Sequence, residues 1–345
     1  MATERLFVVS VIAVAAFSIS AWLTHRFARS SSWLYVLDHP NARSLHARPT
    51  PRTGGVAILA TCYLCAGVAL AYLGTATAAL LWLAAAGLVV GGISFIDDRA
   101  GVAAAYRLGA HTAAAAIVVL GGFVLSRVEL PGPVFGVQPF VGALASGLFI
   151  AWMINLYNFM DGMDGFAGGM ALFGFGTLAI LGWCAEHETF ALLSAVIAAS
   201  AAGFLVFNFP PARIFMGDAG SSTLGLFAGA FTLWGARDGV FPLWVGVLVF
   251  SPFVVDATVT LLRRFVRGEK VWEAHKTHYY QRLVQLGWGH RKTVLVEYVL
   301  MLGCGLTALL AVKAGVGVQW AVILTWAGIY SGFFGWVGRL ECRAP

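Results

Sequence analysis

Six of the sixteen acidic residues in this 345-residue chain lie at or near the ends of long apolar segments. They are Asp97, Asp98, Asp161, Asp164, Asp218 and Asp256. An ionised side chain costs at least about 2.5 kcal/mol at the centre of an apolar span, so the group is poorly explained as packing or as helix caps. Neighbouring carboxylates repel each other unless a cation or a proton lies between them. The pattern therefore favours a bound cation.

The ligands that these residues offer suit a hard cation such as Mg²⁺. This ion prefers oxygen ligands and commonly binds through one or two carboxylates together with substrate phosphates, and Mn²⁺ accepts similar ligands. Asn158 adds a neutral oxygen three residues before Asp161, and Gly162 and Gly217 let the backbone approach a ligand. We expect a magnesium-dependent site, with manganese as a substitute, that acts on phosphates.

Basic residues of two long polar segments complement these acids. Residues 38–55 read DHPNARSLHARPTPRTGG, and residues 275–283 read HKTHYYQRL with histidines three positions apart. Histidines among cations suit the binding of a phosphate-rich ligand. The chain has no G-x-x-x-x-G-K-[ST] loop, so an ATP-driven P-loop mechanism is not supported.

Membrane helices must position these residues. Hydrophobic residues make up 59% of the chain, charged residues only 11%, and the mean hydropathy is +0.82. A soluble domain carries about twice that charged fraction, so a water-soluble enzyme is excluded. The apolar runs predict one all-α integral membrane domain over residues 1–345, a bundle of about eleven transmembrane helices. The runs are 6–24, 54–73, 76–96, 103–126, 139–157, 166–185, 189–207, 221–236, 240–262, 293–313 and 316–338.

The basic residues predict how the bundle is oriented. With the N-terminus outside, eighteen of the 22 Lys and Arg residues fall on the cytoplasmic side, as the positive-inside rule requires. The cytoplasmic loops are then 25–53, 97–102, 158–165, 208–220 and 263–292. The active-site cleft and the C-terminus therefore face the cytoplasm. The net charge of +6 is explained by membrane topology and lipid headgroups, the Arg263, Arg264 and Arg267 run included, so no nucleic-acid partner is expected.

The ordered motifs resemble the polyprenyl-phosphate N-acetylhexosamine-1-phosphate transferase family. The matching segments are 38–55, FIDDR (95–99), NLYNFMDGMDG (155–165), FNFPPARIFMGDAGS (207–221) and 275–283. The resemblance implies transfer of a sugar 1-phosphate from a UDP-N-acetylhexosamine to undecaprenyl phosphate, with release of UMP. This step would start the synthesis of O-antigen or another cell-envelope polysaccharide at the bacterial inner membrane. The resemblance also allows a homodimer.

The resemblance assigns roles to individual residues as well. Asp218 would be the principal Mg²⁺ ligand, with Asn158 as the second. Asp164 would contact the uracil end of the donor, and Phe215 and Gly217 belong to the substrate-binding set.

The remaining assignments concern catalysis and the phosphates. Asp97 and Asp98 would lie beside the lipid phosphate, where either is a candidate base, and Asp161 would support the site. The diphosphate or the sugar would be bound by His275 and His278 and by one or more of His46, Arg48 and Arg52.

Three other functions fit the sequence less well. In the related phospho-N-acetylmuramoyl-pentapeptide transferases a DDxxK-type lysine is expected, but this chain reads Asp97-Asp98-Arg99-Ala100-Gly101, and its histidine motif is reduced. An ion-coupled transporter needs acids near mid-span, which only Asp256 provides. A non-catalytic glycan-assembly scaffold leaves the other five aspartates unexplained. The sugar is left open between N-acetylglucosamine, N-acetylgalactosamine and their 6-deoxy relatives.

Overall fold

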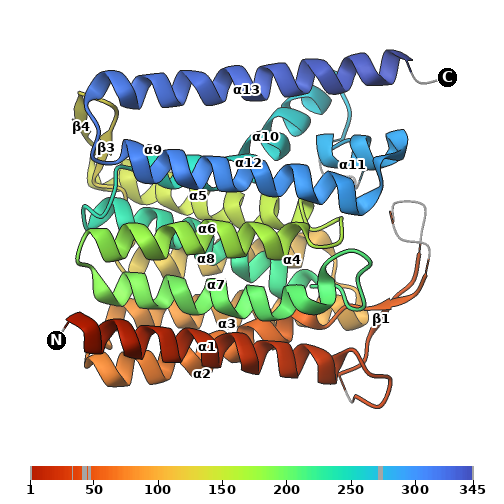
Figure 1. The fold of residues 1–345 in the computed structure, drawn as a ribbon, viewed down its shortest axis with the longest axis horizontal. Coiled ribbons are helices and arrows are strands. Elements are labelled where there is room, and N and C mark those ends of the chain that lie inside the picture. The colour runs from red at the N-terminus through yellow and green to blue at the C-terminus, as the bar shows by residue number, and fades with distance from the viewer. Residues whose placement is uncertain (1, 33, 41–44, 46–47, 271–274, 344–345) are drawn as a thin grey trace.

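The computed structural model describes residues 2–32, 34–40, 45, 48–270 and 275–343. Its helices lie side by side as one all-α bundle (Figure 1). The first seven helices are α1 (Ala2–Phe27), α2 (Gly54–Leu73), α3 (Ala78–Ala100), α4 (Ala104–Leu120), α5 (Pro139–Phe159), α6 (Phe166–Cys184) and α7 (Glu188–Asn208). The rest are α8 (Asp218–Arg237), α9 (Leu243–Val249), α10 (Ser251–Val266), α11 (Tyr279–Leu283), the π-helical turn η1 (Val284–Trp288), α12 (Gly289–Ala311) and α13 (Val316–Arg343).

The membrane fold class is confirmed, but the count of eleven spans is not. Eight helices in the described part of the chain are long and apolar enough to cross a membrane, or nine if α9 and α10 form one broken span. Helix α4, expected as a span over 103–126, has only 17 residues and ends at Gly121 and Gly122. At 1.5 Å per residue it covers about 25 Å, which is at the lower end of the lengths that cross a ~30 Å hydrocarbon core, so this span stays a prediction.

Helix α8 is less apolar than the candidate spans, as expected of a helix that contacts protein on all sides instead of lipid. Every residue from Ala219 to Ala236 is buried, and α8 packs against α2, α3 and α5. Its small residues allow this close approach. A Cβ atom added at Gly225 would collide with the backbone of Met153 in α5, and one at Gly220 with Gly55 in α2. The N-terminus of α8 therefore lies between the ends of several other helices.

The expected span over 240–262 is broken in the structure. Helices α9 and α10 meet at an angle of 83° next to Phe250. Pro252 stands in the first turn of α10, where its missing N–H and fixed φ favour a helix start over a continuation of α9. As a result, α10 leaves the bundle direction and carries Asp256 and its arginine-rich last turn toward the end where α11 lies (Figure 1).

The connections fall into two groups at opposite ends of the bundle (Figure 1). One end holds α11, the end of α13 and a short antiparallel pair, β1 (Leu37–Asp38) with β2 (Thr50–Pro51). The other end holds the start of α1 and a hairpin of β3 (Arg127–Glu129) and β4 (Val134–Gly136). The two chain ends thus lie on opposite sides, in line with the sequence-based topology, while the assignment of these sides to cytoplasm and exterior stays a prediction.

Candidate active site

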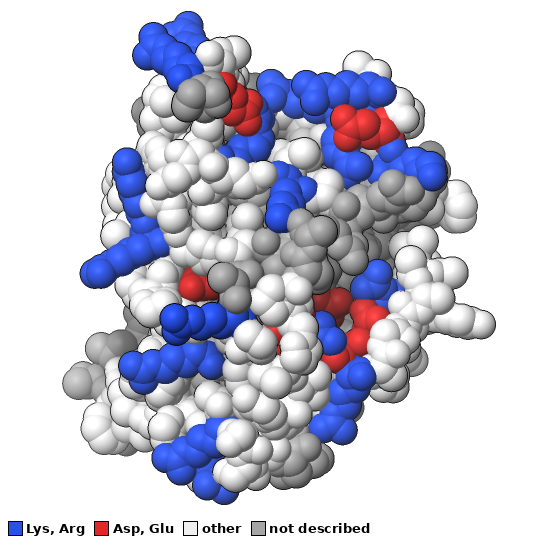
Figure 2. Space-filling view, turned by 90° about the vertical axis from the view of Figure 1, so that its right-hand side faces the viewer, with Lys and Arg blue, Asp and Glu red and all other residues white. Residues whose placement is uncertain are grey.

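An acidic cavity of about 170 Å³ lies at the end of the bundle that carries β1 and α11. Figure 2 views this end and shows acidic side chains in a hollow, with Lys and Arg beside them. Five carboxylates line the cavity against one guanidinium, that of Arg52, and the imidazole of His290. The carboxylates belong to Asp38, Asp98, Asp161, Asp164 and Asp218. The cavity therefore holds a large excess of negative charge.

Asp98, in the last turn of α3, caps the N-terminus of α8. Its buried carboxylate accepts the backbone N–H groups of Asp218 at 3.2 Å and of Ala219 at 3.1 Å. A helix N-terminus carries partial positive charge, which stabilises a carboxylate there. Gly217 has φ +77°, and a Cβ atom at this position would collide with the carbonyl oxygen of Arg52. The motifs at 95–99 and 207–221 therefore meet, and the Asp218 side chain borders the cavity.

Arg107, in the first turn of α4, lies between two of the aspartates. Its Nη1 donates to Asp97 Oδ2 at 2.6 Å and to Asp218 Oδ2 at 3.4 Å. Asp97 also accepts the N–H of Val102 at 2.6 Å. Asp97 is not among the described residues that line the cavity, and it holds Arg107 in place. By hydropathy and charge alone, Arg107 is one of the eighteen basic residues predicted on the cytoplasmic side. Its place near the site could have been predicted from the turn at Gly101, which brings Arg107 back toward Asp97, ten residues earlier in the chain.

Arg52 joins the cavity from the segment between β2 and α2. Its Nη2 donates to the carbonyl oxygen of Asp98, and its Nη1 lies 3.7 Å from Asp38 Oδ1. Backbone hydrogen bonds from Phe215 to Pro51 and from Gly55 to Met216, both 2.7 Å long, fix this segment against residues 215–216.

Of the basic residues predicted in the first polar segment, Arg52 is therefore at the site. Phe215 and Gly217 also line the cavity. Arg48 lies outside the described lining, and His46 falls outside the described residues.

The loop between α5 and α6 supplies Asp161 and Asp164. Asp164 accepts the N–H of Ala212 at 2.9 Å and lies 3.0 Å from Nδ1 of His290 at the start of α12. Burial, followed by repulsion from Asp218, Asp98 and Asp38, raises the pKa of Asp161 well above its ordinary value. A cation in the cavity would oppose this shift.

Two asparagines tie the polar turns together. Buried Asn208 accepts the N–H of Gly165 and donates to the carbonyl oxygen of Ile214, each at 2.9 Å. Asn158 donates to Ser221 Oγ at 3.1 Å, in the first turn of α8 that begins at Asp218. The predicted metal ligands Asn158 and Asp218 are thus held near each other.

The histidine motif has a different environment from the one expected. His278 is buried, with Nδ1 3.4 Å from Oδ1 of Asp256. Asp256 also accepts the N–H groups of Tyr279 at 3.0 Å and Tyr280 at 3.2 Å, so it caps α11. The ring of His275 lies against that of His278, with the centroids 4.7 Å apart and the planes tilted by 34°. Neither histidine belongs to the described lining of the acidic cavity, and Asp256 takes part in packing.

Asp256→Asn is expected to lower the free energy of unfolding by about 1–3 kcal/mol, because the uncharged amide has one acceptor oxygen where two oxygens now accept the two backbone N–H groups. Thermal unfolding in detergent measures this change. Glu186→Gln, at an exposed carboxylate in the turn between α6 and α7, is the matched control and should unfold like the wild type. Equal unfolding temperatures for wild type and Asp256→Asn would reject the capping role.

The ligands at the acidic cavity fit a divalent cation that is shared with a substrate. Within the described residues, no three His, Cys, Asp or Glu side chains converge as a closed metal site. Mg²⁺ is usually held by one or two protein carboxylates and completes its shell with water and substrate phosphates. Asp218, with Asn158 beside it and Asp98 behind it, offers that open arrangement.

The fold and the cavity together define a class: a multi-pass membrane protein with an acidic site for phosphate chemistry at one end of its bundle. Comparison with known proteins agrees with this class. Residues 79–236 match the family described as "Glycosyl transferase family 4".

Three relatives illustrate the similarity. Over 271 residues the chain is 30% identical to a probable undecaprenyl-phosphate N-acetylglucosaminyl 1-phosphate transferase of Bacillus subtilis, covering 77% of this chain and 74% of the relative. Over 326 residues it is 32% identical to a decaprenyl-phosphate N-acetylglucosaminephosphotransferase of Mycobacterium tuberculosis, covering 84% and 79%. Over 266 residues it is 29% identical to a phospho-N-acetylmuramoyl-pentapeptide-transferase of Shouchella clausii, covering 73% and 80%.

The chain belongs to the family of polyprenyl-phosphate N-acetylhexosamine-1-phosphate transferases. It is a membrane enzyme that transfers a sugar phosphate to a prenyl phosphate. The predicted family and reaction are confirmed, and the transporter and scaffold alternatives are set aside.

Proposed function

We propose that the acidic cavity transfers N-acetylhexosamine 1-phosphate from a UDP-sugar to undecaprenyl phosphate in a Mg²⁺-dependent reaction. The observation that supports this most is the meeting of Asp98, Asp218 and Arg107 at the N-terminus of α8. These residues come from separate segments of the chain, and together they combine oxygen ligands, a cationic side chain and a helix N-terminus.

In the proposed reaction an oxygen of the lipid phosphate attacks the sugar-linked phosphorus of the donor. A new P–O bond forms, the P–O bond to the UMP phosphate breaks, and UMP leaves with that bonding pair. The bond between the sugar and its phosphate stays intact, so the anomeric configuration is unchanged. When bound, Mg²⁺ supplies neutralisation of the diphosphate charge.

The protein side chains hold the reactants. Arg52 and Arg107 bring positive charge to a cavity in which two anions must meet. Asp97 and Asp98 already accept hydrogen bonds from protein groups, which favours a positioning role for both. A phosphate monoester loses its second proton near pH 6, so the acceptor carries a nucleophilic oxygen at pH 7 without strong help from a base.

The donor nucleotide is proposed to bind beside Asp164 and His290, which form an ion pair at the cavity wall. Asp164→Asn and His290→Gln should each raise the KM for the UDP-sugar about tenfold while changing kcat little, because each removes a ground-state contact. The KM of the double variant should be at most about twofold higher than that of either single variant, because both substitutions break the same ion pair. Steady-state kinetics measure these values, and fully additive effects would show that the two residues act separately.

For the sugar, we propose N-acetylglucosamine. Two of the relatives named above carry N-acetylglucosamine in their names, and the DDxxK-type lysine expected of the pentapeptide transferases is replaced by Gly101 here. The O-antigen pathway, the inner-membrane location with an outside N-terminus, and a homodimer stay predictions. The relatives' names favour a cell-envelope glycan as the destination of the product.

The test is UMP release by the purified chain with Mg²⁺ and undecaprenyl phosphate. Parallel reactions contain UDP-N-acetylglucosamine, UDP-N-acetylgalactosamine, the 6-deoxy donors or UDP-N-acetylmuramoyl-pentapeptide. We expect UMP release with the first donor at least about tenfold faster than with the others, and none after chelation of the metal. Turnover of the pentapeptide donor alone would assign the chain to the other branch, and turnover in a chelator would reject the metal.

A further inference from the structure

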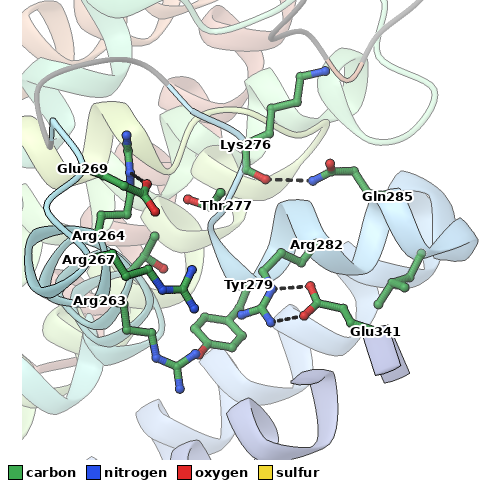
Figure 3. A pocket seen from close by; sticks show the side chains of 12 residues that line it. Arg263, Arg264, Arg267, Glu269, Lys276, Thr277, Tyr279, Arg282, Gln285 and Glu341 are labelled. Atoms are coloured by element: carbon green, nitrogen blue, oxygen red, sulfur yellow. Dashed lines mark hydrogen bonds and ion pairs between the residues drawn. The ribbon is translucent and has the colours of Figure 1, made fainter. Parts of the chain in front are cut away.

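A second cavity lies on the other side of α11 from the acidic one. Gln281 of α11 faces the acidic cavity, while the next residue, Arg282, faces this one. It encloses about 360 Å³ and is lined by the last turns of α10, the residues just before α11, α11 itself and Glu341 of α13 (Figure 3). Five basic and two acidic residues line this basic cavity, an excess of three positive charges. Its electrostatics are therefore the reverse of the acidic cavity.

Two of the five cations are neutralised by neighbours. Arg282 makes a bidentate ion pair with Glu341, in which Nε lies 2.5 Å from Oε1. Arg264 donates from Nε to Glu269 at 2.8 Å. Figure 3 shows both pairs at the wall of the cavity. The first pair links α11 to α13, and the second joins the last turn of α10 to the residues that follow it.

The other three cations form no ion pair with any of the described residues. Within the described residues, no carboxylate lies within 4 Å of Arg263, Arg267 or Lys276. Arg263 is near enough to Arg282 and Arg267 for their charges to repel, and the single carboxylate of Glu341, already paired with Arg282, offsets this repulsion only in part. Like charges held together by the fold are stabilised when an anion binds among them, and guanidinium groups suit phosphate oxygens in particular.

Tyr279 provides an independent indication of a ligand. This residue lines the basic cavity, is completely buried and stacks on Phe334 at 3.9 Å, yet its hydroxyl group has no hydrogen-bond partner among the described residues. The guanidinium groups of Arg263 and Arg282 lie 5.2 and 4.4 Å from the centre of its ring. A buried hydroxyl without a partner costs stability, and a phosphate oxygen held by these arginines would supply one.

The surroundings place the basic cavity at the level of lipid headgroups. Phe265 and Val266, between its arginines on α10, are 71% and 83% exposed, as expected of side chains that face lipid. Trp336 on α13 lies five residues before Glu341 and packs edge-to-face on Trp288, and tryptophan is enriched at the membrane–water boundary. The cavity is also about twelve times the ~30 Å³ that one water occupies in the liquid, which leaves room for a phosphate and part of a glycerol.

We infer that the basic cavity binds the phosphate group of an anionic membrane lipid. Arg263, Arg267 and Lys276 supply the charge, and Tyr279 supplies a hydroxyl donor. The acyl chains would extend along the exposed apolar side chains of α10. This site is separate from the acidic cavity and does not depend on the proposed reaction.

The test measures lipid binding and not turnover. The purified full-length protein in detergent is titrated with phosphatidylglycerol, phosphatidylcholine or inorganic phosphate, and bound lipid is counted by native mass spectrometry. We expect phosphatidylglycerol to bind at least about tenfold more tightly than phosphatidylcholine. Arg263→Gln/Arg267→Gln should weaken it about thirtyfold, since each basic residue near an anionic surface contributes about fivefold. Both residues are exposed, so the fold should persist, which thermal unfolding checks.

Arg339→Gln is the matched control, because Arg339 is exposed on the same last turns of α13 but outside the cavity lining. Tyr279→Phe removes only the hydroxyl and should weaken binding severalfold. Equal weakening by Arg339→Gln would show unspecific attraction and overturn the inference. Equal affinity for both lipids, or displacement of phosphatidylglycerol by millimolar inorganic phosphate, would overturn it as well.

Discussion

Asp218→Asn should lower the rate of UMP release at least about 1,000-fold, which corresponds to about 4 kcal/mol of transition-state stabilisation. Asparagine keeps the shape of the side chain but loses the charge that a hard divalent cation requires. The fold should survive, because the cap on α8 uses the backbone N–H of residue 218 and the carboxylate of Asp98. The measurement is UMP release at saturating donor, acceptor and Mg²⁺.

A matched control lies at the other end of the same helix. Asp238→Asn makes the same chemical change just after α8, where Asp238 bonds with Trp234 and Arg237, and turnover should stay within about twofold of wild type. Mg²⁺ should also raise the unfolding temperature of wild type and Asp238→Asn but not that of Asp218→Asn, since a ligand stabilises only the state that binds it. Near-normal turnover of Asp218→Asn would reject its metal role.

Arg107→Gln should lower kcat/KM for the UDP-sugar about 100-fold, the usual scale for losing one charged group that stabilises developing negative charge. The guanidinium is held by Asp97 at 2.6 Å and reaches Asp218 at 3.4 Å, so it is already oriented toward the site. Because the variant leaves the carboxylates more negative, the Mg²⁺ concentration needed for half-maximal rate should not rise. Steady-state kinetics over a Mg²⁺ series test both expectations.

Two further variants separate charge from geometry at this position. Arg107→Lys keeps the charge but not the fork of donors, so its loss should be intermediate, about tenfold. Arg29→Gln removes a charge from an exposed arginine after α1 whose side chain bonds only His25 among the described residues, and its kinetics should match the wild type. Unchanged kcat/KM in Arg107→Gln would show that the arginine serves only the fold.

The membrane fold and much of the acidic cavity were predictable because the signals are local. Apolar runs of about twenty residues indicate spans wherever they occur, and charges cluster at the ends of those runs. Asp98, Asp161, Asp164 and Asp218 were therefore expected on one side of the membrane. The structure places all four on one cavity.

Sequence hydropathy could not distinguish contact with lipid from contact with protein, since both favour apolar residues. Helix α8 is enclosed by other helices, α4 is shorter than its apolar run, and the run at 240–262 breaks next to Phe250. The contacts of the histidine motif were not visible in the sequence either. His278 lies beside Asp256, which caps α11, while the role of His278 in catalysis stays a prediction.

The sequence by itself determined the membrane class, the side on which the acids gather and the motifs of the family, because each depends on residues near one another in the chain. Only the tertiary structure decided which distant residues meet. The cap of Asp98 on α8 joins residues 120 positions apart through the close approach at Gly217, and the bridge of Arg107 to Asp218 depends on the same packing. Such contacts are set by how helices pack, which the order of residues along the chain does not display.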